Sequence, residues 1–83
     1  MRLLLAEDEA SLSKAIVMIL KKNNYTVDAA YDGIEALEYL AANEYDGVIL
    51  DVMMPRMDGI EVLQKIRKEG SSVPVMLLTA RSE

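Results

Sequence analysis

The stretch Val48-Ile49-Leu50-Asp51-Val52-Met53-Met54-Pro55 decides how this chain is expected to fold. A short run of valine, isoleucine and leucine bounded by breakers predicts a strand that is buried on both faces. An aspartate in the middle of such a strand would be buried away from water, so Asp51 is placed at its C-terminal end, before the turn-forming Pro55. The sequence therefore predicts a strand over residues 47–50 that delivers a carboxylate to the edge of the core.

Two further apolar runs also end in polar residues. Leu3-Leu4-Leu5 leads into Glu7-Asp8-Glu9, and Val75-Met76-Leu77-Leu78 leads into Thr79. In an open parallel sheet the C-terminal ends of the strands lie along one edge, which is the edge where ligands bind. We therefore expect these polar groups to gather at one place.

The segments between the strands have helical patterns. Three helices are predicted: from about residue 9 to 22, from the Asp32 cap to about 43, and from the Asp58 cap to Gly70, a glycine that suits the end of a helix. A further strand is predicted over residues 25–30. In the first helix, an apolar stripe is predicted to face inward: Leu12, Ile16, Ile19 and Leu20. The order β-α-β-α-β-α-β calls for parallel strands with right-handed crossovers. The predicted class is α/β, a doubly wound parallel sheet.

Composition narrows the possible functions. The chain has 83 residues, enough for one domain at most, and no apolar run approaches the about 20 residues that span a bilayer. It contains no cysteine, which excludes disulfides and thiolate metal sites and favours a cytoplasmic setting. It contains no histidine, which excludes the commonest general base and zinc ligand. The net charge of −5 argues against direct binding of nucleic acid.

The acidic residues at the strand ends predict a cation site. If the first and third strands are neighbours, Glu7, Asp8 and Asp51 come close together and repel one another unless a proton or a cation lies among them. Oxygen ligands without histidine or cysteine favour Mg²⁺ or Mn²⁺ over zinc. Such a metal suits phosphate chemistry and leaves one carboxylate free to attack phosphorus. Each acid taken singly is more often an ordinary solvated loop residue, and Thr79 alone is more often a local hydrogen-bonding group.

These patterns resemble the receiver domain of two-component response regulators. The resemblance is carried by RLLLAEDE at Arg2 to Glu9, by Asp32-Gly33 with Ala36-Leu37, by VILDVMMPRMDG at Val48 to Gly59, and by PVMLLTA at Pro74 to Ala80. It extends over the whole chain, and the block that contains Asp51 is highly specific. It implies a flavodoxin-like, doubly wound sheet with the strand order 2-1-3-4.

The resemblance also implies roles for the matching residues. Asp51 is expected to accept a phosphoryl group from a sensor histidine kinase, Thr79 to supply a switch hydroxyl, and Ala80 to leave room for the phosphoryl group. The Mg²⁺ ligands that it implies are Asp8, Asp51, the backbone carbonyl of Met53 and, in the outer shell, Glu7. A protein that modifies its own side chain in this way is not expected to be a turnover enzyme.

Receivers continue beyond the elements predicted here with a fourth helix, a fifth strand and a fifth helix, and the fifth strand begins with a lysine that pairs with the phosphoryl group. Every lysine of this chain is assigned to a helix: Lys14, Lys21, Lys22, Lys65 and Lys68. We therefore expect residues 1–83 to form a single partial receiver domain that lacks those elements. Its open fourth-strand edge favours self-association. The parent protein is expected to regulate transcription, with a winged-helix domain outside this segment contacting DNA.

Three alternatives remain open at this point. A haloacid-dehalogenase-type phosphatase also uses a strand-end aspartate and Mg²⁺. Its motif is Asp-x-Asp, and here Met53 stands where the second aspartate would be. A flavodoxin-type binding protein would need a loop rich in serine, threonine and glycine after the first strand. The third alternative is a structural fragment of a flavodoxin-like domain that cannot signal because the phosphate-pairing lysine is absent.

Overall fold

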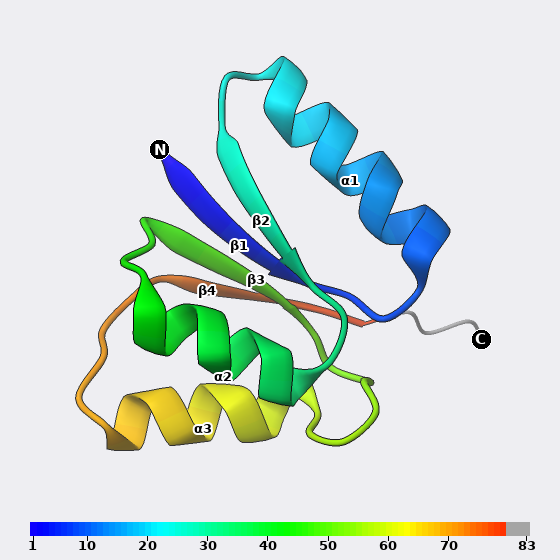
Figure 1. Cartoon of the computed structure of the whole chain (residues 1–83). Coiled ribbons are helices and arrows are strands. Elements are labelled where there is room, and N and C mark those ends of the chain that lie inside the picture. The colour runs from blue at the N-terminus through cyan, green and yellow to red at the C-terminus, as the bar shows by residue number, and fades with distance from the viewer. Residues whose placement is uncertain (80–83) are drawn as a thin grey trace.

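Strands and helices alternate along the chain in the computed structural model, which describes residues 1–79 (Figure 1). The strands are β1 (Arg2–Ala6), β2 (Thr26–Ala30), β3 (Gly47–Asp51) and β4 (Val75–Leu78). The helices are α1 (Ala10–Lys22), α2 (Gly33–Ala42) and α3 (Gly59–Lys68). All strand pairs are parallel and the sheet order is β2-β1-β3-β4, so the predicted fold class and strand order are confirmed. None of the described helices has the length and apolar character that spanning a membrane requires.

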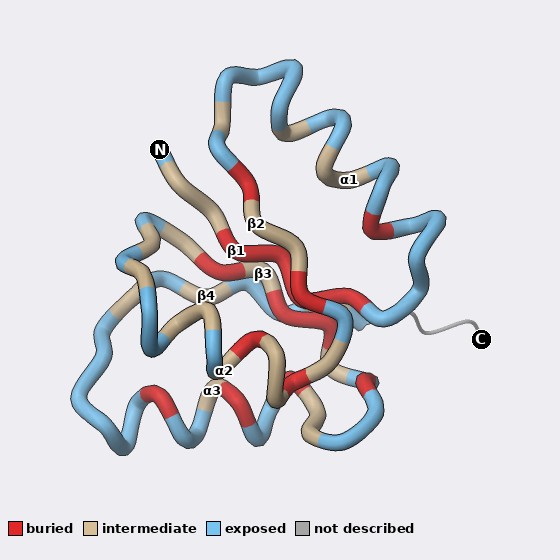
Figure 2. Tube along the Cα trace, viewed as in Figure 1, coloured by how far each residue is buried: buried red, intermediate tan, exposed pale blue. Residues whose placement is uncertain are grey.

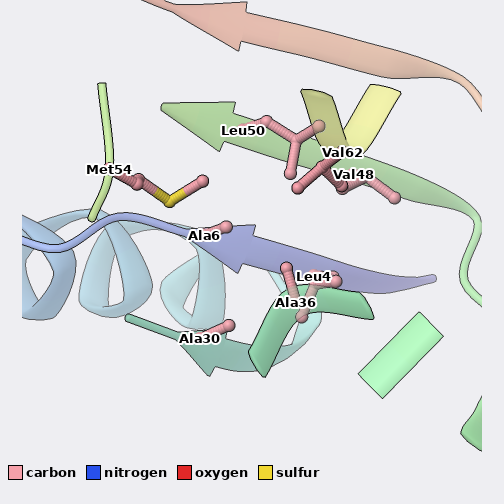
Figure 3. Packing of buried hydrophobic residues seen from close by; sticks show 8 residues of the cluster. All are labelled: Leu4, Ala6, Ala30, Ala36, Val48, Leu50, Met54 and Val62. Atoms are coloured by element: carbon pink, nitrogen blue, oxygen red, sulfur yellow. The ribbon is translucent and has the colours of Figure 1, made fainter. Parts of the chain in front are cut away.

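The two faces of the sheet are covered unequally. Figure 1 shows α2 and α3 side by side on one face, and α1 on the other face against β1 and β2. Figure 2 shows the buried positions concentrated in the two central strands, whereas most of α1 is exposed. The main core therefore lies between the sheet and the α2–α3 pair. Its buried members, drawn in Figure 3, are Leu4, Ala6, Ala30, Ala36, Val48, Leu50, Met54 and Val62.

The predicted helix caps are present. Asp32 and Asp58 each accept a hydrogen bond from the backbone N–H three residues on, at 2.8 Å, and Glu61 completes a capping box at α3. At α2 the side chain of Glu35 accepts instead from the backbone N–H of Tyr31, at 2.7 Å. Gly70 follows α3 with a φ of 95°, a left-handed conformation that glycine adopts without a steric cost. Local sequence signals thus determine where these helices begin and end.

The prediction for the inner face of α1 was wrong in part. Ile16 and Leu20 are half-buried, but Leu12 and Ile19 are 42% and 60% exposed, and the only buried residue of α1 is Ser13. The reason is that α1 packs on β1 and β2 alone, and no other described element covers the rest of its apolar stripe. On the same face of the sheet, Met76 of β4 is 60% exposed, because α1 does not reach β4.

A polar network joins the segments at the amino-terminal edge of the sheet. Asp28 accepts hydrogen bonds from the Tyr45 hydroxyl, at 2.7 Å, and from Nη2 of Arg2, at 2.9 Å. The Tyr45 bond, assisted by Arg2, holds the pKa of Asp28 below its usual value against the effect of burial. Burial and the bond to Asp28 raise the pKa of Tyr45 to about 12. The network was not predicted, because its residues are far apart in the sequence and no local signal indicates that they pair.

This network predicts a pH dependence of stability. Because the folded pKa of Asp28 is lowered, its contribution is present above the unfolded value of about 3.9 and is lost as the pH falls through the folded value. The folded pKa of Tyr45 is raised, so the contribution of Tyr45 to stability is present below the unfolded pKa of about 10. That contribution is lost as the pH rises towards about 12. Tyr45→Phe should lower the free energy of unfolding at neutral pH by about 1–2 kcal/mol.

Urea unfolding across this pH range checks the prediction, with Tyr31→Phe as the matched control because Tyr31 is 44% exposed. Tyr31→Phe should unfold like the parent protein at every pH. The parent protein should lose stability as the pH rises from the unfolded to the folded pKa of Tyr45. Tyr45→Phe should not show this loss, because phenylalanine has no hydroxyl to ionise. An unchanged urea midpoint at neutral pH for Tyr45→Phe would show that the bond between Tyr45 and Asp28 contributes nothing to stability.

Candidate metal centre at the carboxyl edge of the sheet

Three carboxylates meet where β1 and β3 end. Glu7, Asp8 and Asp51 each place one carboxylate oxygen so that the three oxygens lie within 4.8 Å of one another. Because β1 and β3 are paired in parallel, Ala6 lies opposite Leu50 and the residues that follow them emerge at the same edge. The predicted gathering of strand-end acids is therefore confirmed.

Hydrogen bonds orient two of the three carboxylates. Glu7 is buried, and its carboxylate accepts from the backbone N–H of Glu9 at 2.8 Å. Its own N–H donates to the carbonyl of Ala30 at 3.0 Å, which ties the end of β1 to the end of β2. Asp51 is 7% exposed, and its Oδ1 accepts from the backbone N–H of Met53 at 3.2 Å. Asp8, by contrast, is exposed.

The cluster is electrostatically unfavourable by itself. Two unit charges 4 Å apart repel by about 4 kcal/mol at an effective dielectric constant of about 20. Burial, and then the neighbouring carboxylates of Asp51 and Asp8, raise the pKa of Glu7, although the N–H of Glu9 opposes this change. A proton or a cation among the three groups would relieve the repulsion.

The donor set fits a hard divalent cation. It consists of carboxylate oxygens from one exposed and two buried residues, with no nitrogen or sulfur ligand in a chain that lacks histidine and cysteine. Mg²⁺ prefers oxygen ligands, binds through one or two carboxylates and keeps several waters, and the exposed Asp8 leaves space for them. The site therefore has the composition of a magnesium centre with open coordination positions.

An open depression lies beside the carboxylates, and it contains two residues of the predicted site. Its lining residues are Asp8, Val52, Met53, Met54 and Asp58. Met53 is 76% exposed, and its backbone N–H is the group that bonds to Asp51. Sequence reasoning assigned Asp58 only as a helix cap and missed its position beside Asp8.

The remaining predicted site residues follow β4. Leu78 pairs with Asp51 in the sheet, and the N–H of Val52 donates to the carbonyl of Leu78 at 2.9 Å. Thr79 is the next residue and is exposed, so it lies at the same edge as the carboxylates. Ala80 lies outside the described residues.

Sequence reasoning also missed a salt bridge between two loops at this edge. Arg56, in the loop after Asp51, donates from Nε to Asp32 at 3.0 Å and from Nη2 at 3.1 Å. The backbone N–H of Glu35 and the guanidinium of Arg56 hold the pKa of Asp32 below its usual value. Opposite charges 24 positions apart in the sequence give no signal of pairing, so only the folded structure identifies this contact.

Comparison with known proteins agrees with the geometry. The family model described as "Response regulator receiver domain" matches residues 3–83. The chain is 45% identical over 83 residues to the transcriptional regulatory protein DltR of Streptococcus agalactiae, covering all of this chain and 37% of that protein. It is 44% identical over 80 residues to the response regulator MprA of Mycobacterium ulcerans, covering 96% of this chain and 34% of that protein.

Solved structures show the same fold. A receiver domain of the Francisella response regulator 1452 superposes with a TM-score of 0.94 and 34% identity, covering 99% of this chain and 68% of that one. The response regulator TrrA of Thermotoga maritima, solved in complex with Mg²⁺-BeF, superposes with a TM-score of 0.92 and 38% identity, covering 98% and 70%. By its sequence and its fold, this chain belongs to the response regulator receiver family of two-component signalling.

Proposed function

We propose that the chain accepts a phosphoryl group on Asp51 in the presence of Mg²⁺. The observation that carries the proposal is the convergence of three carboxylate oxygens within 4.8 Å, one of them from Asp51 at the end of a buried strand. The Mg²⁺-BeF complex of the related TrrA supports the same chemistry. The phosphodonor that we propose is the phosphohistidine of a sensor histidine kinase.

The transfer makes one bond and breaks one. A carboxylate oxygen of Asp51 attacks phosphorus in line with the leaving group, and a P–O bond forms as the P–N bond to the donor imidazole breaks. The electron pair of that bond stays with the imidazole nitrogen. The N–H of Met53, which donates to Oδ1 of Asp51, fixes the rotation of the carboxylate before the attack. The donor imidazole leaves and the phosphoryl group stays on Asp51, so the transfer does not regenerate the protein and we do not assign it as a turnover enzyme.

Asp8, Asp51 and the backbone carbonyl of Met53 are the residues that we assign as Mg²⁺ ligands, with Glu7 in the outer shell. The metal would offset the negative charge of the phosphoryl oxygens. Asp8 suits direct contact because it is exposed, and Glu7 suits an indirect role because it is buried and already accepts a bond from Glu9. We assign Thr79 as the switch hydroxyl because it follows the sheet partner of Asp51.

The output that we propose is control of transcription. The chain spans about a third of the curated relatives that it matches, and one of these is named a transcriptional regulatory protein. With a net charge of −5, residues 1–83 do not suit the DNA backbone. We therefore assign contact with DNA to a part of the protein outside this segment.

We also propose that the 83-residue chain pairs with a second copy along β4. Among the described residues β4 is bonded only to β3, and its sequence from Val75 to Leu78 carries no charge. The opposite edge strand, β2, carries Asp28, a charge of the kind that protects sheet edges. The unprotected edge is therefore the one that suits a second copy of the same strand.

The metal assignment is tested by two neighbouring acids. Asp8→Asn should weaken Mg²⁺ binding by at least about tenfold, since even outer-shell substitutions cost about 10–100-fold. Glu9→Gln is the matched control, because Glu9 caps α1 through the N–H groups of Ser11 and Leu12. We expect it to change the Mg²⁺ affinity by less than about twofold, since its charge is exposed and screened.

The measurement is the mass gain of the intact protein with acetyl phosphate at a series of Mg²⁺ concentrations, together with a direct Mg²⁺ titration. Half-maximal incorporation should move to higher Mg²⁺ concentration for Asp8→Asn alone. Equal losses in the two variants, or a greater loss in Glu9→Gln, would contradict the assignment of Asp8.

A further inference from the structure

The salt bridge between Arg56 and Asp32 joins the two loops that flank the carboxylate cluster. Nε and Nη2 of Arg56 donate to the two oxygens of Asp32 at 3.0 and 3.1 Å, a bidentate arrangement. Asp32 lies two residues after the end of β2 and caps α2, where its side chain accepts from the N–H of Glu35. Arg56 belongs to the loop that connects Asp51 to α3. The bridge therefore anchors a loop of the site to a fixed helix end.

The backbone of this loop is constrained at several points. Arg56 has a φ of 68°, a left-handed conformation that costs a residue with a side chain about 1–2 kcal/mol. The N–H of Met57 donates to the carbonyl of Pro55 at 2.8 Å, and that of Gly59 donates to the carbonyl of Val52 at 3.0 Å. Strained residues of this kind persist where the surrounding contacts determine their conformation, and they occur often at functional sites.

A second contact brings the same two loops together. Gly33, the first residue of α2, is buried so closely against Met57 that a Cβ at position 33 would collide with its carbonyl. The loop is thus attached to α2 at its strained residue, by the guanidinium of Arg56, and at the following residue, by the contact of Met57 with Gly33. Between these attachments and Asp51 lies Met53, whose N–H orients the Asp51 carboxylate.

Stability alone does not account for this arrangement. The side chain of Arg56 is 59% exposed, and exposed ion pairs contribute only about 0–1 kcal/mol. That is no more than the conformation of Arg56 costs. The bridge is better explained by what it holds in place.

We propose that Arg56 is a positioning residue: by bridging to Asp32 it holds the loop between Asp51 and α3 in the conformation that binds the cation. The inference rests on the proposed Mg²⁺ site. Arg56 itself carries a positive charge and is not a ligand. Its effect passes through the backbone of residues 52–55 to the Met53 carbonyl and the Asp51 carboxylate.

The sign of two substitutions separates positioning from simple electrostatics. Arg56→Gln removes a positive charge near the site, so electrostatics alone predicts tighter Mg²⁺ binding, whereas loss of positioning predicts weaker binding. Asp32→Asn removes a negative charge, and asparagine is an equally good helix cap, so α2 is preserved. Positioning predicts that both variants bind Mg²⁺ more weakly, by about tenfold each, as outer-shell substitutions do.

The double variant Asp32→Asn/Arg56→Gln completes the test. If the two residues act only through their bridge, the double variant should bind Mg²⁺ no more weakly than either single variant, whereas independent effects would multiply. Arg56→Lys should recover only part of the affinity, because an ammonium group cannot form the bidentate contact. Each affinity is measured by the chemical-shift changes of backbone amides on titration with MgCl₂.

Arg2→Gln is the matched control, since Arg2 bridges to Asp28 at the opposite edge of the sheet through the same two nitrogens, Nε and Nη2, both of which donate to Oδ2 of Asp28. It should lower the urea midpoint and leave the Mg²⁺ affinity unchanged, which separates positioning from general destabilisation. Unchanged or tighter Mg²⁺ binding by Arg56→Gln overturns the inference while leaving the proposed function intact. Failure of the parent protein itself to bind Mg²⁺ overturns both.

Discussion

Asp51→Asn should reduce the incorporation of a phosphoryl group from acetyl phosphate to the background of the assay. The amide of asparagine lacks the carboxylate oxygen that attacks phosphorus, while its size leaves the end of β3 intact. The same substitution should abolish binding of the beryllofluoride mimic. Intact-protein mass and fluorine resonances measure the two effects independently.

A second consequence of Asp51→Asn separates chemistry from unfolding. The substitution removes one of three carboxylates whose oxygens lie within 4.8 Å, and so removes much of the repulsion among them. Without Mg²⁺ the variant should therefore melt at a higher temperature than the parent protein. A variant that is inactive and also less stable would show that Asp51 has a structural role that its repulsive surroundings do not predict.

Asp46→Asn is the control for this experiment. Asp46 is exposed at the opposite edge of the sheet, where it accepts a hydrogen bond from the N–H of Arg2 at 2.8 Å, and an asparagine can accept the same bond. It should retain full incorporation and bind the beryllofluoride mimic like the parent protein. Incorporation that survives in Asp51→Asn would mean that another residue is the phosphoacceptor.

The 83-residue chain should self-associate through β4 at micromolar concentration. Pro74 and Leu78 direct their carbonyls to β3, so the alternation of the strand places the N–H groups of Val75 and Leu77 at the open edge. Unpaired groups of this kind bind another strand. A closed two-fold dimer is the commonest arrangement of identical chains, and it would pair the two copies of β4 in antiparallel orientation.

Met76→Lys should weaken this dimer by at least about tenfold, which is 1.4 kcal/mol. The two-fold axis brings the centre of β4 close to its own copy, where two lysines would repel each other. Met18→Lys is the matched control, because Met18 of α1 is exposed to a similar extent, 65% against 60% for Met76, but lies away from the edge. Sedimentation equilibrium over a range of concentrations measures both variants. A parent protein that remains a cooperatively folded monomer at high micromolar concentration would contradict the proposal.

Much of the fold could be predicted because its signals are local. The apolar run before Asp51 and the cap signals at Asp32 and Asp58 each depend on residues within a few positions of one another. Such signals place strand ends and helix ends directly. Given parallel strands, they also place Asp8 and Asp51 at one edge, since the C-terminal ends of parallel strands share it.

The face that a helix buries could not be predicted in the same way. The stripe on α1 is periodic, yet Leu12 and Ile19 are exposed, because periodicity reports an apolar face and not whether another element covers it. Glu7 and Asp8 are adjacent acids with the same local signal. Glu7 is 4% exposed, whereas Asp8 lies at the surface. Glu7 is buried because β1 packs between two neighbouring strands and because the N–H of Glu9 donates to its carboxylate.

The fold class, the strand ends and the family could be derived before folding is considered, because they depend on short motifs and on the order of elements. Which charges meet, by contrast, is known only from the folded chain. The Arg56–Asp32 bridge and the Arg2–Asp28 bridge each join residues more than 20 positions apart. The first depends on how the loop after Asp51 packs against the start of α2, and the second on the pairing of β1 with β2. The reason is that Coulomb attraction depends on the distance between two charges in space, and the spacing of the two residues along the sequence does not determine that distance.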